Sequence, residues 1–446
     1  MLRFGTDGVR GVALSELTPQ YVASLGTAAA RVLGSGTWLV GRDTRESGPA
    51  LEAALVHGLR AAGALVVRCG VVPTPALAHF SATHQSPAAM ITASHNAFSD
   101  NGVKIFAAGG TKLNDDVEQQ IEAQLEAGLV VPDDADLGPD TLRDDAGISV
   151  VHTLVETYVE HIVGMFPPHA LRGVRVVLDC ANGAMSAAAP AALRSLGADL
   201  VVINAEPDGS NINAGCGATH TGPLARAVVE HGAAAGLAFD GDGDRVIAVD
   251  NRGNVVDGDR LIALSALQLQ AEGTLTDDTV VVTVMSNIGF HRAMRDAGIT
   301  VVTTAVGDRY VLEALDAGGY SIGGEQSGHV IYRHVATTGD GLLAGLKLLQ
   351  RLHDSGQPLA TMAAEVMQSF PQVLVNVIVK ERHPDITAEL RDEILAAEVE
   401  LGQEGRVLIR ASGTEPLIRV MVEAATDDHA AELAERLARI VRARFG

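Results

Sequence analysis

The chain has 446 residues, more than a single hydrophobic core can serve, so three or four domains of ordinary size are expected. Hydrophobic residues make up 47% of the sequence and charged residues 20%, which excludes an intrinsically disordered protein. The formal net charge of −22 argues against binding to nucleic acid or to an anionic membrane through the overall field, but a cleft with clustered arginines can still bind a small anion.

The N-terminus and the cysteines indicate a reducing compartment. Residues 1–11, MLRFGTDGVRG, carry charges and glycines where a signal peptide needs an apolar run, and no apolar run in the sequence approaches 18 residues. Cys69, Cys180 and Cys216 are too few and too scattered for a disulfide framework or a CxxC metal site. We therefore expect a cytoplasmic protein whose cysteines are small apolar fillers.

Short apolar runs alternate with segments of helical periodicity over most of the chain, a pattern typical of a mainly parallel α/β sheet. The first block has strands at 38–41, 64–68 and 88–91 and helices near 49–63 and 75–80. The second has strands at 174–179, 199–204 and 236–239 and helices near 187–197 and 223–232. The third has strands at 279–284, 300–304 and 320–324 and helices near 288–298 and 308–318. Each block ends in a polar, glycine-rich loop, and because ligands gather at the carboxyl ends of strands in such sheets, we expect the three loops to converge on one cleft.

After about residue 368 the pattern changes to that of a small α+β domain with antiparallel pairing. Its strands are predicted at 372–380, 406–411 and 417–424 and its helices at 386–400 and 427–445. The predicted fold is therefore three similar mixed α/β domains around a central cleft plus a smaller C-terminal α+β domain. The expected domains span residues 1–155, 156–254, 255–366 and 367–446.

A serine ends the first block, in the segment TASHNAFSDNGVKIF at 92–106. Ser94 follows an apolar run and is succeeded by His95, Asn96 and, after an Asn-Gly turn, Lys104, which we expect in one short loop. A lone serine more often caps or turns the chain, but polar donors around a hydroxyl can also neutralise a phosphate added to it. On these residues alone both interpretations stay open.

The second loop, DGDGDR, places Asp240, Asp242 and Asp244 at alternate positions of a glycine-containing turn. Three hard oxygen ligands at this spacing suit Mg²⁺. An EF-hand would need Gly and Glu at its sixth and twelfth positions, which here are Arg245 and Asn251, so that interpretation fails. A plain acidic turn would leave three carboxylates repelling one another, so a metal site is favoured.

The third loop, GGEQSGH at 323–329, offers Glu325, Ser327 and His329 as hydrogen-bonding groups, with glycines that allow close backbone approach. This suits a polyhydroxylated ligand. Taken alone the signal is weak, because a glycine-rich turn with one exposed glutamate is common.

The last loop, RASGTEPLIR, combines arginines and hydroxyls with backbone N–H groups, which together can form a phosphate site. The residues concerned are Arg410, Ser412, Gly413, Thr414 and Arg419. A strand-turn-strand hairpin with outward charges is the simpler interpretation, and the two are compatible because a hairpin can itself bind an anion.

The segment FGTDGVRG at 4–11 and the motifs TASHN, DGDGDR, GGEQSGH and RASGTEP, in this order, resemble those of the α-D-phosphohexomutases over nearly the whole chain. FGTDGVRG and the glutamine of GGEQSGH are similar to the phosphoglucosamine branch of that family. Ala97 departs from the pattern, since many relatives have proline after TASHN, but the departure removes no reacting group.

The resemblance implies a role for each motif. Ser94 would carry the phosphoryl group, and one Mg²⁺ per chain would be held by Ser94 and the three aspartates. The proton of the attacking hydroxyl would be handled by Lys104, Arg10, His95 and His329. A lysine can accept a proton at neutral pH only if burial or neighbouring cations depress its pKa. Arg245, Glu325 and Ser327 would bind the sugar phosphate, and the residues of the last loop would hold the phosphate that is not reacting.

The implied reaction interconverts glucosamine 6-phosphate and glucosamine 1-phosphate through a bisphosphorylated sugar, feeding the synthesis of UDP-N-acetylglucosamine and cell-wall precursors. Three alternatives stay open: a phosphomannomutase/phosphoglucomutase of the same family, a non-catalytic sugar-phosphate sensor, and a metal phosphatase. A hexosamine phosphate is the expected partner, with no nucleic acid and no membrane. A homodimer is a further expectation to test, because the sequence does not reveal the oligomeric state.

Overall fold

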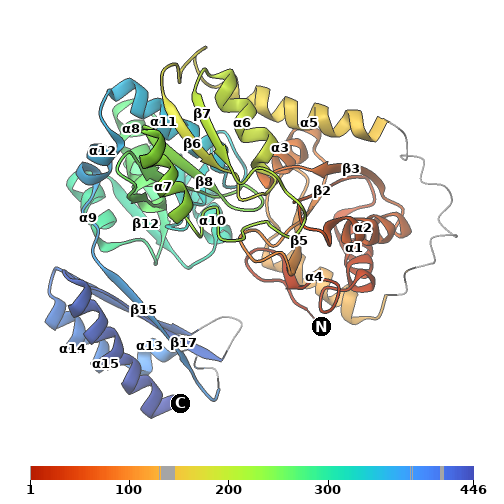
Figure 1. Cartoon of the computed structure of the whole chain (residues 1–446). Helices are drawn as coiled ribbons and strands as arrows, with labels where there is room; N and C mark the ends of the chain where they lie inside the picture. The colour runs from red at the N-terminus through yellow and green to blue at the C-terminus, as the bar shows by residue number, and fades with distance from the viewer. Residues whose placement is uncertain (1, 130, 132–145, 382, 384, 412–415) are drawn as a thin grey trace. The chain divides into compact units, whose positions relative to one another are not determined.

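The computed structural model of the chain describes residues 2–129, 131, 146–381, 383, 385–411 and 416–446. These residues form two compact units. One comprises the residues up to Met285 together with Thr300–Ala364, and the other comprises Ser286–Ile299 together with Glu365–Gly446. Figure 1 traces both from the N-terminus in red to the C-terminus in blue.

Three sheets make up the first unit. The first sheet contains β1 (Val9–Val12), β2 (Thr37–Arg42), β3 (Leu65–Val71), β4 (Ala88–Ile91) and β5 (Asp100–Phe106). The second contains β6 (Arg175–Asp179), β7 (Asp199–Ile203), β8 (Ala235–Phe239), β9 (Val246–Asp250) and β10 (Val255–Val256). The third contains β11 (Thr279–Thr283), β12 (Thr300–Thr304), β13 (Ile322–Gly324) and β14 (Val330–Tyr332). The strand orders are β1-β5-β4-β2-β3, β10-β9-β8-β6-β7 and β12-β11-β13-β14.

Helices cover these sheets. They are α1 (Pro19–Leu33), α2 (Gly48–Ala61), α3 (Thr74–His84), α4 (Asp115–Glu126), α5 (Ala146–Val163), α6 (Met185–Ser195), α7 (Gly222–His231), α8 (Gly258–Ala271), α10 (Asp308–Gly318), α11 (Gly341–Ser355) and α12 (Leu359–Val366), with a short 3-10 turn at Thr276–Asp278. Side-chain caps begin several of them: Thr18 accepts from the N–H of Tyr21 before α1, and Asn114 from that of Val117 before α4. The central strands β4, β8 and β11 are buried along their whole length, which explains why they read as continuous apolar runs.

The three sheets repeat one arrangement, in which three parallel strands are followed by a strand that returns antiparallel to the third. The returning pairs are β4–β5, β8–β9 and β13–β14. The prediction of three similar α/β blocks is confirmed, but the returning strands were not predicted. In particular Lys104, expected in a loop, lies within β5 opposite Met90 of β4. The short connecting loops made each returning strand look like part of a polar segment.

The second unit is an antiparallel sheet with helices, as predicted for an α+β domain. Its elements are α9 (Ile288–Asp296), β15 (Gln372–Ile378), α13 (Ile386–Glu389), α14 (Arg391–Leu401), β16 (Arg406–Ala411), β17 (Leu417–Glu423) and α15 (Asp427–Phe445), with strand order β15-β17-β16. The single helix predicted at 386–400 is divided at Leu390, whose backbone is not helical and whose side chain is buried. The helix predicted in the third block, α9, belongs to this unit, because Asn287 exchanges hydrogen bonds with Phe370 and Glu423 accepts from the N–H of Ile288.

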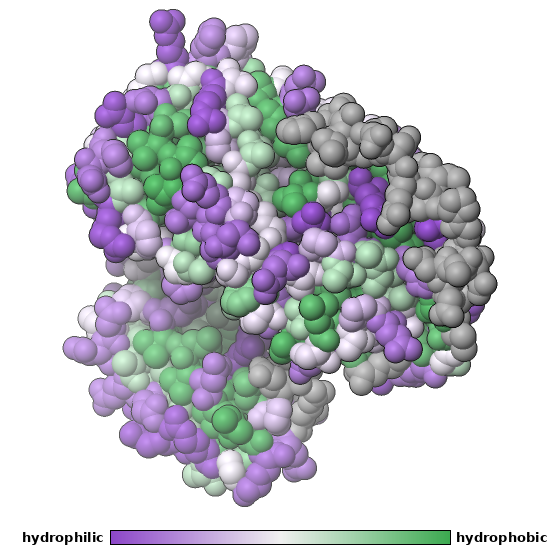
Figure 2. Space-filling view, turned by 45° about the vertical axis from the view of Figure 1, so that its right-hand side comes forward, coloured by the Kyte–Doolittle hydropathy of each residue, from purple (hydrophilic) through white to green (hydrophobic). Residues whose placement is uncertain are grey.

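The burial of the cysteines and the hydropathy of the surface agree with the composition of the sequence. All three cysteines are buried. On the face shown in Figure 2, hydrophilic and hydrophobic residues are interspersed. None of the helices in the described part of the chain combines the length and the apolar character that crossing a bilayer requires.

We expect Gly58→Ala to destabilise the first unit by about 1–3 kcal/mol, because α1 and α2 lie side by side (Figure 1) with their backbones in contact. A Cβ added at Gly58 would lie 1.8 Å from the carbonyl oxygen of Ala23, and the Thr27 hydroxyl donates to the Gly58 carbonyl at 2.8 Å. Urea unfolding followed by circular dichroism measures the change. Gly36→Ala is the control, since nothing lies within 4 Å of its added Cβ. Equal midpoints for the two variants would contradict the prediction.

Candidate active site

Three loops occupy equivalent positions in the three sheets of the first unit. Residues 92–99 join β4 to β5, residues 240–245 join β8 to β9, and residues 325–329 join β13 to β14. The Ser94 hydroxyl donates to Asp240 Oδ2 at 2.6 Å, and His329 Nδ1 lies 3.6 Å from Asp244 Oδ1. The sheet topology therefore brings the three polar loops together, as expected from their places in the sequence.

The aspartates of the second loop form a buried cluster. One oxygen from each of Asp240, Asp242 and Asp244 lies within 4.8 Å of the others. The Oδ1 atoms of Asp242 and Asp244 are buried without a hydrogen-bond partner. Burial, together with the charges of the other two carboxylates, raises the pKa of Asp240 well above its usual range. Hard oxygen atoms, close together and short of donors, are the ligand set that suits Mg²⁺.

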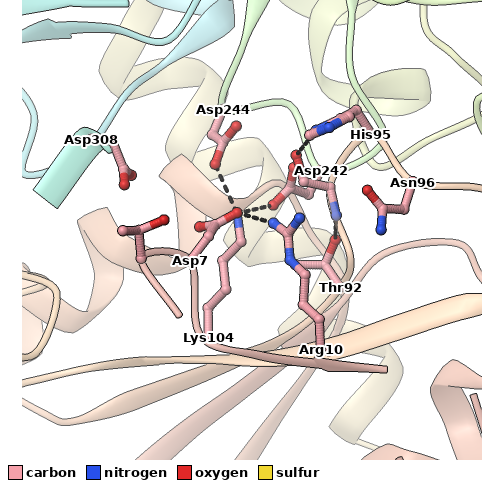
Figure 3. A network of polar contacts seen from close by, with 12 residues as sticks. Asp7, Arg10, Thr92, His95, Asn96, Lys104, Asp242, Asp244 and Asp308 are labelled. Carbon is pink, nitrogen blue, oxygen red and sulfur yellow. Dashed lines mark hydrogen bonds and ion pairs between the residues drawn. The ribbon is translucent and has the colours of Figure 1, made fainter. Parts of the chain in front are cut away.

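Lys104 is the principal cation at this cluster. Its Nζ donates to Asp242 Oδ2 and to Asp244 Oδ2, each at 2.8 Å, and lies 3.1 Å from Asp7 Oδ1, as Figure 3 shows. Burial lowers the pKa of Lys104, but Asp242 and Asp244 outweigh it and the pKa is raised. In this arrangement Lys104 is therefore charged. In this form Lys104 can donate a proton or neutralise an anion, and the carboxylates that raise its pKa are themselves candidate metal ligands.

Arg10 lies beside Lys104 and forms an ion pair with Asp7 (Figure 3). Its side chain comes from β1, which pairs with β5, and its Nε is buried without a hydrogen-bond partner. Arg245 follows the three aspartates in the same loop. Its Nε is also buried without a hydrogen-bond partner and lies 3.8 Å from Asp244 Oδ1. Two guanidinium groups with unused donors at one site are suited to bind an anionic ligand.

Each of the two histidines at the site has a ring nitrogen within hydrogen-bonding distance of a neighbouring group. His95 Nδ1 lies 3.3 Å from the Ser94 hydroxyl oxygen, and burial together with Arg245 and Arg10 lowers its pKa to about 4. His329 Nε2 accepts a hydrogen bond from the N–H of Gly339 at 3.0 Å. In the neutral ring this hydrogen bond places the proton on Nδ1, the nitrogen that faces Asp244.

The remaining residues of the third loop differ in exposure. Glu325 is buried and its Oε1 accepts from the N–H of Gly307 at 3.2 Å, whereas Ser327 is exposed. Both lie in the loop that ends at His329. A ligand bound beside His329 would therefore meet a carboxylate and a free hydroxyl from the same short segment.

Arg410 and Arg419 lie in the second unit, opposite each other on β16 and β17. Burial and the charge of Arg419 lower the pKa of Arg410, and Arg419 Nε is buried without a hydrogen-bond partner. Like charges directly opposite across a sheet are destabilising unless an anion neutralises them. This pair is therefore suited to an anion. Ser412, Gly413 and Thr414 lie outside the described residues.

Several residues at the site were not identified from the sequence. Asp7 bridges Lys104 and Lys112, and Lys112 also pairs with Asp308 at the start of α10. Burial would raise the pKa of Asp308, but Lys112 and His329 outweigh it and lower it to about 2. The Thr74 hydroxyl donates to Asp242 Oδ2 at 2.7 Å. Asp7 stands within the quoted segment FGTDGVRG and could have been found there, whereas the other three carry no local signal.

The sequence matches the phosphoglucomutase/phosphomannomutase family along most of its length. The matches are to α/β/α domain I over residues 1–129, α/β/α domain II over 156–253, α/β/α domain III over 257–370 and the C-terminal domain over 374–440. A phosphoglucosamine mutase from Frankia alni is 52% identical, with 99% of this chain and 98% of the relative covered. One from Kineococcus radiotolerans is 53% identical, with 99% of each chain covered.

A solved structure shares the fold. It is that of a phosphoglucomutase/phosphomannomutase family protein from Burkholderia thailandensis, which superimposes with a TM-score of 0.79 at 25% identity. The superposition covers 98% of this chain and 97% of the other. The three α/β sheets and the C-terminal sheet are thus the arrangement of a known architecture.

Proposed function

The chain belongs to the phosphoglucomutase/phosphomannomutase family, and we propose that it acts as a phosphoglucosamine mutase, interconverting glucosamine 6-phosphate and glucosamine 1-phosphate. The observation that carries the proposal is the buried Ser94 hydroxyl, which lies 2.6 Å from Asp240, a member of a cluster of three carboxylates whose other two members bind Lys104. The amino sugar is proposed from the names of the relatives that are about half identical to this chain.

In the proposed reaction the phosphoryl group of phosphorylated Ser94 passes to a hydroxyl of the sugar phosphate. The bond from phosphorus to Ser94 Oγ breaks, a bond to the sugar oxygen forms, and the hydroxyl loses its proton. Arg10 and charged Lys104 would neutralise the moving group, which is what a loose transition state requires. The proton would pass to His329 at Nε2 only after the hydrogen bond from the N–H of Gly339 is released, because that nitrogen has one lone pair and Gly339 occupies it. The bisphosphorylated sugar would then return its other phosphoryl group to Ser94.

The residues present fit a magnesium ion. Ser94, Asp240, Asp242 and Asp244 would hold it, and the two aspartate oxygens without partners have capacity for a cation. When bound, Mg²⁺ supplies positive charge to the oxygens of the phosphoryl group.

The sugar and the second phosphate have proposed sites too. We assign Arg245, Glu325 and Ser327 to the sugar phosphate, on the donors and the carboxylate described above. Arg410 and Arg419 would hold the phosphate that is not reacting, since they lie opposite each other on β16 and β17 and neither has an acidic partner among the ion pairs of the described residues. Ser412, Gly413 and Thr414 are assigned to the same phosphate from the sequence.

Substrate comparison tests the proposal. Purified protein with Mg²⁺ and a catalytic amount of glucose 1,6-bisphosphate is offered glucosamine, glucose and mannose 6-phosphates separately, and products are followed by ³¹P NMR. We expect the highest kcat/KM with glucosamine 6-phosphate and no change in total ester phosphate. A preference for mannose or glucose phosphate would indicate the related mutase activity instead. Release of inorganic phosphate would indicate a phosphatase, and binding without any conversion a sensor.

A further inference from the structure

A buried guanidinium lies beneath the loop that carries Ser94. Arg45 is fully buried, and its Nε donates to Asp43 Oδ2 at 2.9 Å. Its two terminal nitrogens donate to the backbone carbonyls of Ser94, Asn96 and Ala97 in the loop and to that of Asp100, the first residue of β5. No part of the proposed reaction uses this arginine. Its N–H groups instead hold the backbone conformation of the loop.

A second donor reaches the same loop from the connection between β7 and α7. Asn213 Nδ2 donates to the carbonyl of Ser94 at 2.9 Å and to that of Asn96 at 3.0 Å. Gly241, in the loop that carries the aspartates, packs its backbone against the Ser94 carbonyl. A Cβ added at Gly241 would lie 2.6 Å from that carbonyl oxygen. The Ser94 carbonyl is therefore held by two side chains and confined by the loop that bears the aspartates.

These contacts hold a conformation that a serine does not prefer. Ser94 has φ of 52°, in the left-handed region, which costs a non-glycine residue about 1–2 kcal/mol. Its N–H donates to the Thr92 hydroxyl, which itself donates to Asp43, the partner of Arg45. The N–H and the carbonyl of Ser94 therefore both form hydrogen bonds with one buried network. In this conformation the hydroxyl meets Asp240.

Arg45 and Asn213, which together clamp the Ser94 carbonyl, also set the direction of a peptide group. In a trans peptide the C=O and N–H point in opposite directions, so a Ser94 carbonyl turned toward Arg45 and Asn213 turns the N–H of His95 away from them. Among the hydrogen bonds of the described residues, the His95 N–H has no acceptor. An N–H next to the phosphorylated oxygen and without a partner is a donor for a phosphoryl oxygen.

We infer that Arg45 and Asn213 are positioning residues for the phosphoryl transfer, which hold the Ser94–His95 peptide so that the hydroxyl faces the aspartates and the N–H faces the phosphoryl group. The inference rests on the proposed function. It predicts that loss of the clamp slows transfer from an enzyme that still folds, still binds substrate and still carries phosphate.

Asn213→Ala is the sharper test, because it removes two hydrogen bonds without leaving a buried charge. We expect kcat per phosphorylated serine to fall about 10–100-fold with KM little changed, since small displacements of a reacting group cost about this much. Phosphoserine content is measured by intact mass after incubation with glucose 1,6-bisphosphate. Asn211→Ala is the matched control, because that side chain makes two hydrogen bonds in the same segment, to Asp208 and Glu206, and none to the Ser94 loop.

Arg45→Lys supplies the second variant, since Arg45→Ala would leave Asp43 buried without a cation and fail to fold. The lysine keeps the charge beside Asp43 but cannot serve four carbonyls, so we expect the same loss in kcat per phosphoserine. An unchanged kcat per phosphoserine in Asn213→Ala would overturn the inference, even if less of that protein were folded. If the wild-type protein converted no sugar phosphate, the proposed function would fail instead.

Discussion

Ser94→Ala is expected to abolish the interconversion of sugar phosphates, with kcat reduced by at least about 10³-fold. The proposed reaction passes through an ester on this oxygen, and removing the atom that forms a covalent intermediate removes the pathway rather than slowing one step of it. The structure provides no substitute, since no other hydroxyl among the described residues donates to Asp240. Coupled assay of glucosamine 1-phosphate measures the loss, and intact mass shows whether phosphate is still incorporated.

The matched control for this variant lies in the same loop. Ser99 is exposed, and among the hydrogen bonds of the described residues it takes part only through its backbone carbonyl, which accepts from the N–H of Ala13. Ser99→Ala should therefore retain wild-type turnover and phosphate content. If Ser94→Ala were active, or carried as much phosphate as the wild type, Ser94 would not be the phosphorylated residue and the proposed mechanism would be wrong.

Removal of the metal is expected to be almost as severe. A chelator should abolish turnover and Mg²⁺ should restore it, while Asp242→Asn should lower kcat by at least about 100-fold, because loss of a ligand costs at least as much as loss of a residue that supports one. Binding to the folded state alone should also stabilise the protein, by about 2.7 kcal/mol at a concentration 100 times the dissociation constant. Mg²⁺ should therefore raise the melting temperature of the wild type and not that of Asp242→Asn.

The melting temperature separates a metal site from an acidic turn without relying on activity. Asp199→Asn is the control, because Asp199 is an exposed carboxylate on β7 that pairs with Arg175. It should retain both the Mg²⁺-dependent rise in melting temperature and the turnover. An equal rise in Asp242→Asn would mean that Mg²⁺ binds elsewhere, and the aspartate cluster would then have a different role.

The role of Lys104 as a proton acceptor stays a prediction, and the structure shows two carboxylates that act against it. The expectation required that neighbouring cations or burial depress the pKa of the lysine. Burial does so, but two carboxylates at 2.8 Å outweigh it. The position of Lys104 on β5, directly opposite β4, brings it to the aspartates, and this pairing could not be read from a segment that looked like a loop.

The sequence by itself determined the features that are local. Three aspartates at alternate positions in DGDGDR must lie close together whatever the fold, and buried central strands are visible as apolar runs because helices cover both of their faces. The ordered motifs were enough to indicate the family. These properties depend on residues that are only a few positions apart, so the order of the sequence is enough to reveal them.

Only the tertiary structure decided which distant residues complete the site. Arg45 lies 49 positions from Ser94 and Asn213 lies 119 positions from it, each in a polar segment that does not reveal which backbone its side chain will contact. Their roles follow from sheet pairing and from close backbone packing, which turn donors from separate blocks toward the same carbonyls. A hydrogen bond needs its two atoms within about 3 Å, and that condition is met by the folded chain and not by the order of its residues.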